Sequence, residues 1–176
     1  MSRTVPWPDG MECTLKTIVS GETFVSGKAN LVISTVLGSC VSVCLYDEAA
    51  GLGGANHYFL SSSQGQSASY GAVAMEHVIN GLMRLGADKS RLRAKVFGGA
   101  LMKEGLADIG KKNASFALEY LQAERLPIVA MDLGGFSARR LHFHPVTGKA
   151  RVVRTEAVPE TTQKPERTLN RVELFN

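Results

Sequence analysis

Two cysteines lie four residues apart in the stretch TVLGSCVSVCLYD, residues 35–47. A thiol with an ordinary pKa of about 8.5 is mostly protonated at neutral pH, so a cysteine nucleophile needs a nearby group that accepts its proton. Cys40 follows a Gly-Ser turn, where backbone amides can bind an oxyanion, and His57 lies 17 residues further on. The spacing is compatible with a hairpin that joins Cys40 and His57, and also with Cys40 as a small buried hydrophobic residue.

A metal site is a second interpretation of the same cysteines. Cys40 and Cys44, together with His142 and His144, offer the kinds of ligand that zinc accepts. Residues 41–46 alternate as a strand does, however, and about 3.3 Å per residue would place the two sulfur atoms roughly 13 Å apart. We therefore do not expect a metal site here.

The elements that would position these residues alternate between strands and helices. Residues 92–97 and 127–132 read as short strands, and so, less regularly, do parts of residues 14–35. Apolar residues with helical spacing predict helices over 72–85 and 109–124. RRLHFHP and KARVVR predict a hairpin with its turn at 146–149. This interleaving predicts a mixed α/β or α+β layer fold.

Length and composition indicate one globular domain, with 176 residues of which 44% are hydrophobic and 20% charged. We expect a loose N-terminal leader over residues 1–13, a domain over 14–154 and a disordered tail over 155–176. The segment MSRTVPWPDGMECT has no apolar h-region, and no run approaches about 18 apolar residues, so we expect a cytoplasmic protein that does not insert into membranes. The net charge of +4 is spread along the chain, which argues against nucleic acid as a partner.

Six blocks of the sequence, taken in order, resemble a single family. They are STVLGSCVSVCLYD, GGANHYFL, SYGAVAMEHVINGLMRLGA, KVFGGALM, IGKKN and PIVAMDLGGFSARRLHFHPVTGKA. From about residue 14 to 154 the chain is similar to the chemoreceptor glutamine deamidases of bacterial chemotaxis, the CheD family. The resemblance implies a single domain built as a three-layer α/β/β sandwich of mixed sheets.

The resemblance also implies an enzyme, a protein-glutamine glutaminase that converts selected glutamines of methyl-accepting chemotaxis receptors to glutamate and releases ammonia. It implies Cys40 as the nucleophile and His57 as the general base, with no cofactor. The third residue of the family's triad is a hydroxyl six positions before the cysteine, where this chain has Ser34 followed by Thr35. Neighbours on a strand face opposite ways, so only one can reach His57. The spacing favours Ser34, with Thr35 as the alternative if the strand carries a bulge.

Further roles follow from the same resemblance. Backbone amides near Gly38, Ser39 and Cys40 would hold the oxyanion. The loops at 61–70 and 97–100 are expected to contact the receptor, because flexible loops beside a site select substrates. The candidate rim residues are Asn56, Tyr70, Phe97, Gly98 and Gly99.

The resemblance implies two partners. Receptor cytoplasmic domains are the expected substrate, and some family members are regulated by a phosphatase of the CheC type. The alternative function is a non-catalytic module that docks on receptors or on such a phosphatase. It is motivated by Ser34, which stands where the family's threonine is expected, and by the fact that a fold can persist without its activity.

Overall fold

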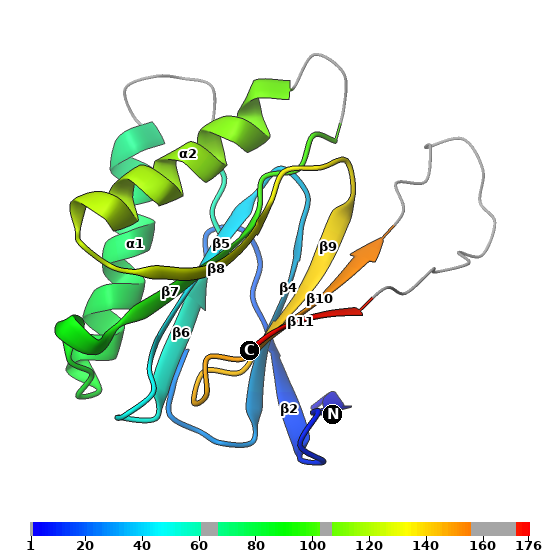
Figure 1. Ribbon diagram of the computed structural model, residues 1–176, viewed down its shortest axis with the longest axis vertical. Helices are drawn as coiled ribbons and strands as arrows, with labels where there is room; N and C mark the ends of the chain where they lie inside the picture. The colour runs from blue at the N-terminus through cyan, green and yellow to red at the C-terminus, as the bar shows by residue number, and fades with distance from the viewer. Residues whose placement is uncertain (1, 61–66, 103–106, 156–171) are drawn as a thin grey trace.

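The computed structural model describes residues 2–60, 67–102, 107–155 and 172–176. Two helices form one layer over two stacked β-sheets (Figure 1). The helices are α1 (Ser67–Arg84) and α2 (Ala107–Ala123), and a short 3-10 helix covers Lys89–Arg91. This arrangement confirms the predicted mixed α/β class and the three-layer α/β/β order.

The five-stranded sheet lies between the helices and the other sheet, and is called the central sheet here. Its strands, in order across the sheet, are β3 (Thr23–Ser26), β6 (Leu52–Asn56), β5 (Val41–Asp47), β7 (Arg93–Gly98) and β8 (Ile128–Leu133). Only β7 and β8 run parallel; the other neighbours are antiparallel. The β5–β6 pair is the hairpin that the interval between Cys40 and His57 allows.

The six-stranded sheet is called the outer sheet. Its strands, in order, are β1 (Thr4–Pro6), β2 (Glu12–Thr17), β4 (Leu31–Leu37), β9 (Ala138–Phe143), β10 (Ala150–Thr155) and β11 (Val172–Phe175). The pair β2–β4 is parallel and the remaining pairs are antiparallel. The predicted hairpin over RRLHFHP and KARVVR is the pair β9–β10.

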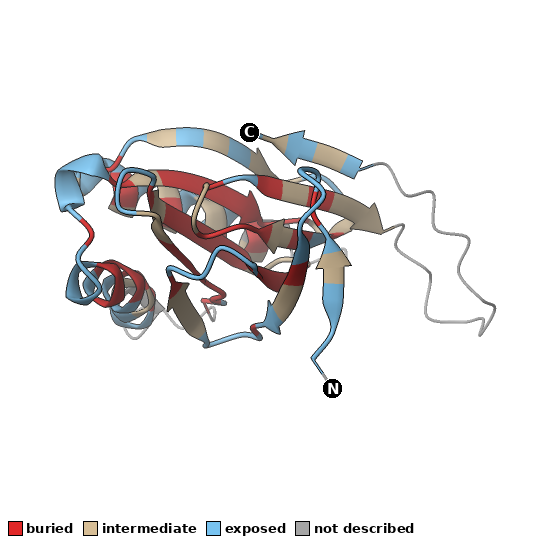
Figure 2. Cartoon of the chain, turned by 90° about the horizontal axis from the view of Figure 1, so that it is seen from below, coloured by how far each residue is buried: buried red, intermediate tan, exposed pale blue. Residues whose placement is uncertain are grey.

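Strand β5 contributes side chains to two hydrophobic cores, one on each face of the central sheet. Val41, Val43 and Leu45 pack on the helix side of the central sheet, whereas Cys44 packs in the core between the two sheets. The alternation follows the two-residue period of a strand. Figure 2 shows the result as a buried middle layer with exposed residues around it.

Both termini differ from the expectation of a loose leader and tail. Trp7, just after β1, is only 3% exposed and stacks on His144 at 5.5 Å between ring centroids, because a tryptophan gains much by burying its large apolar surface. At the other end, β11 pairs with β10. Residues 156–171 of the predicted tail lie outside the described residues. No helix among the described residues is long and apolar enough to cross a membrane.

Candidate active site

The β5–β6 hairpin extends past β6 through one further pair, Val41 and Tyr58. Tyr58 N–H donates to the Val41 carbonyl at 2.9 Å and Val41 N–H donates to the Tyr58 carbonyl at 3.1 Å. Both side chains belong to the helix-side core, so the residues before them, Cys40 and His57, face the outer sheet. In this register Cys40 and His57 are diagonal cross-strand neighbours, with about 7–8 Å between their backbone positions. That separation lets the thiol and the imidazole approach each other.

His57 is held from the outer sheet by a hydroxyl on β4. Thr35 Oγ1 lies 2.7 Å from His57 Nδ1 and also 2.7 Å from the carbonyl oxygen of Ile18. The backbone of His57 is fixed as well, because its N–H donates to the Glu22 carbonyl at 3.0 Å and its carbonyl accepts from Gly21 N–H at 2.8 Å.

These contacts determine the tautomer of His57. The Ile18 carbonyl can only accept, so the single hydroxyl proton of Thr35 goes to it, and Thr35 must then accept from Nδ1–H of the neutral imidazole. The lone pair therefore resides on Nε2. That atom is buried and has no hydrogen-bond partner among the described residues. A basic nitrogen without a partner, on the face that carries Cys40, is available to accept a thiol proton.

The structure corrects the preference for Ser34 as the third residue. Thr35 faces the inter-sheet space and contacts His57, whereas Ser34 points to the opposite face of the outer sheet, where its register partner is His142. Strand β4 pairs with β9 in an unbroken register through both residues. Counting positions from the cysteine is off by one, because the exact length of the turn after β4 cannot be read from spacing.

In the turn that carries Cys40, the backbone carbonyl groups of residues 38–40 all accept hydrogen bonds from buried groups of the protein. The Gly38 carbonyl accepts from Ala100 N–H at 2.9 Å and the Cys40 carbonyl accepts from Gly99 N–H at 2.8 Å. Between them, the Ser39 carbonyl accepts from Asn113 Nδ2 at 2.8 Å. The N–H of a trans peptide points opposite to its C=O, and the chain has no cis bonds among the described residues. The N–H groups of Ser39 and Cys40 are thus directed away from these partners, as oxyanion donors must be.

Burial shifts both titratable groups toward their neutral forms. Desolvation raises the pKa of the half-buried Cys40 thiol, and the backbone N–H of Cys40 itself partly offsets that shift. Desolvation lowers the pKa of His57, against smaller opposite effects of the Ile18 carbonyl and Glu22. Both shifts favour a thiol beside a neutral imidazole at neutral pH.

The residues predicted for the substrate rim lie in two environments. Tyr70 on α1 is 44% exposed. Asn56 is fully buried and accepts from Val43 N–H at 2.8 Å, and Phe97 is fully buried in the inter-sheet core. These two side chains support the scaffold and present no surface to a substrate. The predicted contact loop at 61–66 lies outside the described residues.

The glycine pair at the end of β7, Gly98 and Gly99, supports the turn that carries Cys40 instead of forming a rim. Both glycines are buried and have positive φ, 114° at Gly98 and 66° at Gly99. A Cβ on Gly98 would lie 2.1 Å from the Cys40 carbonyl oxygen. Only glycine permits this approach, so the pair sets how closely β7 supports Cys40.

Two further residues hold this region and were not assigned a role from the sequence. Arg139 is 1% exposed and donates to the carbonyls of Gly98, Asp132 and Gly134, which ties β9 to the glycine turns. Asn113 is fully buried on α2 and bonds the Ser39 carbonyl. The available signal for Asn113 was an amide on the apolar side of an amphipathic helix, where an unpaired polar group would be costly.

The residues of the metal interpretation do not converge. Cys44 is buried in the inter-sheet core, where burial raises its pKa to about 12. His142 lies on the far face of the outer sheet beside Arg151, and Nε2 of His144 lies 2.6 Å from the Ala29 carbonyl.

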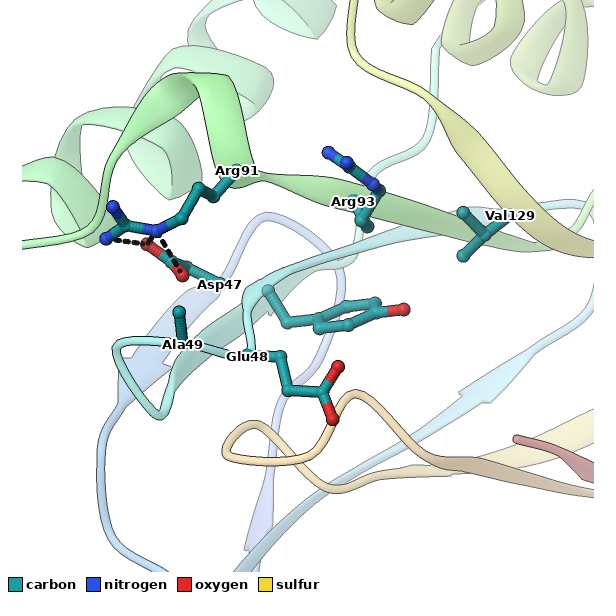
Figure 3. Close-up of a pocket in the computed structure, with 7 residues that line it drawn as sticks. Asp47, Glu48, Ala49, Arg91, Arg93 and Val129 are labelled. Atoms are coloured by element: carbon teal, nitrogen blue, oxygen red, sulfur yellow. Dashed lines mark hydrogen bonds and ion pairs between the residues drawn. The ribbon is translucent and has the colours of Figure 1, made fainter.

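A hollow of about 420 Å³ lies at the other end of β5 (Figure 3). Its lining includes Asp47, whose carboxylate accepts from Arg91 Nη2 at 2.9 Å. This pairing lowers the pKa of Asp47 to about 2. Asp47 lies seven positions along the chain from Cys40, about 23 Å in an extended strand, so this hollow is separate from the thiol.

The fold and the site together define a three-layer α/β/β protein with a thiol and an imidazole at one end of its central sheet. The family model described as CheD chemotactic sensory transduction matches residues 55–154. The chain belongs to the CheD family.

Curated relatives agree with this assignment. The chain is 49% identical over 137 residues to the probable chemoreceptor glutamine deamidase CheD 1 of Ruegeria sp. (strain TM1040), covering 76% of this chain and 73% of the relative. It is 43% identical over 155 residues to the probable chemoreceptor glutamine deamidase CheD of Caulobacter vibrioides (strain NA1000 / CB15N), covering 84% and 83%. Among solved structures, a Neisseria meningitidis protein of the DUF152 family aligns with a TM-score of 0.44 at 10% identity, over 65% of this chain and 53% of the other.

Proposed function

We propose that the protein hydrolyses the side-chain amide of glutamines in chemoreceptors, with Cys40 as nucleophile and His57 as general base. The observation that carries this proposal is the state of His57, whose Nδ1 is held by Thr35 while its buried Nε2 has no partner among the described residues. The names of the curated relatives supply the substrate class. Because the expected substrates are receptor cytoplasmic domains, we also propose that the protein acts in the cytoplasm.

The first half of the reaction forms a thioester. His57 Nε2 accepts the thiol proton while the Cys40 sulfur attacks the carbonyl carbon of the glutamine amide. The N–H groups of Ser39 and Cys40 stabilise the negative charge that develops on the amide oxygen. The imidazolium then returns the proton to the departing nitrogen, so the C–N bond breaks and ammonia leaves.

The second half regenerates the enzyme. Water gives a proton to His57 Nε2 and attacks the thioester carbonyl, and the same N–H groups hold the oxyanion. The carbon–sulfur bond breaks, Cys40 takes the proton back, and glutamate remains on the receptor. One amide and one water yield one carboxyl group and one ammonia, with His57 neutral at the start and the end.

The test is to incubate the protein with a receptor cytoplasmic fragment and to follow ammonia release and a +1 Da change at glutamine-containing peptides. Cys40→Ala is expected to abolish both signals. Cys44→Ala is the matched control, because Cys44 is a buried cysteine on β5, four residues after Cys40 and outside the site. Activity that survives in Cys40→Ala would exclude the mechanism.

The alternative of a non-catalytic docking module loses its main support. That alternative depended on Ser34 at the position of the family's hydroxyl, and Thr35 supplies a hydroxyl to His57 instead. Receptor binding without ammonia release, unchanged in Cys40→Ser, would nevertheless establish it. Regulation by a CheC-type phosphatase stays a prediction, and co-purification with such a phosphatase with altered ammonia release would test it.

A further inference from the structure

We infer that Asn113 on α2 is a positioning residue that fixes the peptide before Cys40 relative to the segment after His57. The expected effect on catalysis rests on the proposed function. The effect on structure does not, because it concerns only how the buried Asn113 side chain joins two backbone segments.

The amide of Asn113 is bonded at both ends. Nδ2 donates to the Ser39 carbonyl at 2.8 Å, and Oδ1 accepts from Leu60 N–H at 2.9 Å. The backbone carbonyl of Asn113 accepts from the hydroxyl of Tyr58 at 2.6 Å. Ser39 directly precedes the proposed nucleophile, and Leu60 comes three residues after the proposed base. Asn113 therefore links the two arms of the site from a third element.

The contact to Ser39 has a directional consequence. The Ser39 carbonyl and the Cys40 N–H belong to one trans peptide and point in opposite directions. A donor that holds the carbonyl toward α2 holds the N–H away from α2. In this way Asn113 orients the amide that both stabilises the Cys40 thiolate and serves as a proposed oxyanion donor.

Packing of the helix alone does not explain why residue 113 is an asparagine. Asn113 is fully buried and shares its helix side with Ala117 and Leu121, both part of the helix-side core. Asparagine is a weaker helix former than alanine, and a buried amide is unfavourable unless it is fully bonded. The amide is thus suited to holding the two loops, more than to packing the helix.

Two variants separate the parts of this link. Asn113→Ala removes both bonds. Asn113→Asp has nearly the same shape and still accepts from Leu60 N–H, but as a carboxylate it cannot donate to the Ser39 carbonyl. Both are expected to lower kcat for receptor deamidation by about 10- to 100-fold with little change in KM, as for a lost oxyanion donor or a misplaced nucleophile.

A second measurement needs no receptor. The rate of Cys40 alkylation by iodoacetamide at fixed pH, read by mass spectrometry, reports the thiolate that the Cys40 N–H stabilises. We expect it to fall several-fold in both variants. Cys44, which is fully buried, must stay protected and so serves as an internal gauge of folding in each sample. Absence of deamidation in the unmodified protein would overturn the proposed function and leave this measurement valid.

Leu121→Ala is the matched control on the same helix. It leaves a cavity in the helix-side core but keeps the Asn113 bonds to Ser39 and Leu60, so it is expected to lower the melting temperature while Cys40 alkylation and kcat of the folded protein stay unchanged. Folded Asn113→Asp and Asn113→Ala with the alkylation rate and kcat of the unmodified protein would overturn the inference. Losses in Leu121→Ala as large as in the Asn113 variants would overturn it too.

Discussion

Thr35 is the residue whose position most changes the description of the site. Its hydroxyl has one proton and two close neighbours, the Ile18 carbonyl and His57 Nδ1. Because the carbonyl takes that proton, His57 must carry its own proton on Nδ1 and keep Nε2 basic. A hydroxyl can therefore orient this histidine as a carboxylate would, but without adding a charge that would raise the pKa of His57.

Replacing the hydroxyl tests this role. Thr35→Val keeps the shape and removes the acceptor for Nδ1, so both tautomers of His57 become accessible, and we expect kcat to fall by about 10- to 100-fold. Thr35→Ser should retain most of the activity. Ser34→Ala is the neighbouring control and should be nearly neutral, since Ser34 faces away from His57. Ammonia release measures all three; a large loss in Ser34→Ala alone would restore the spacing-based assignment.

The pKa directions of Cys40 and His57 predict the pH dependence. His57 must be neutral to accept a proton, and its pKa is lowered by burial, so kcat/KM should fall on acidification only below pH 6.5. The thiol pKa is raised, so direct alkylation of Cys40 should increase with a midpoint above pH 9.0. Alkylation that is already maximal at pH 7 would instead indicate a preformed thiolate–imidazolium pair.

Strand β11 provides a hydrogen-bond acceptor for a buried lysine. Lys95 on β7 is 1% exposed, and its ammonium donates to the Phe175 carbonyl on β11 at 2.9 Å and lies 5.5 Å from the Tyr46 ring centroid. Desolvation lowers the pKa of Lys95, so the charged form depends on these partners. The Phe175 ring also meets Phe97 edge-on at 5.4 Å. The last strand therefore closes the core between the two sheets.

Removing residues 172–176 is expected to lower the free energy of unfolding by about 2–4 kcal/mol, because Lys95 loses its acceptor and Phe97 its cover. Urea denaturation of the shortened and full chains measures the difference. Lys95→Met in the shortened chain should recover part of the loss, since it removes the uncompensated charge. Equal midpoints for the shortened and full chains would show that β11 contributes little.

The site as a whole is divided between the two sheets. Cys40 and His57 belong to the β5–β6 hairpin of the central sheet, whereas Thr35 belongs to β4 of the outer sheet. Packing between the sheets therefore sets the distance between hydroxyl and imidazole. Packing between the central sheet and the helices affects that distance only indirectly.

Two matched cavities test this division. Leu141 is the register partner of Thr35 and lies in the inter-sheet core, whereas Leu82 lies in the helix-side core. Leu141→Ala and Leu82→Ala should each lower the free energy of unfolding by about 2–5 kcal/mol. At a temperature where both are folded, only Leu141→Ala should lower kcat. Equal kcat values in the two variants would contradict the dependence on inter-sheet packing.

Local patterns predicted much of this fold. The two-residue period of β5 and the 3.6-residue period of α1 and α2 are set by short-range backbone geometry, so the sequence alone indicates them. The pairing of β11 was not predictable, because a four-residue strand after a polar segment has no periodicity of its own. The burial of Trp7 against His144 is likewise a contact between residues far apart in the chain.

The sequence by itself determined the family, the proposal of Cys40 and His57 as a reactive pair, and most of the elements beside them. Only the tertiary structure decided that Thr35, and not Ser34, reaches His57, and that Asn113 joins the two arms of the site. The reason is physical: residue types and local periods are properties of one segment, whereas a hydrogen bond between segments depends on how sheets stack. The geometry of the site depends on hydrogen bonds between segments, such as the one between Thr35 and His57.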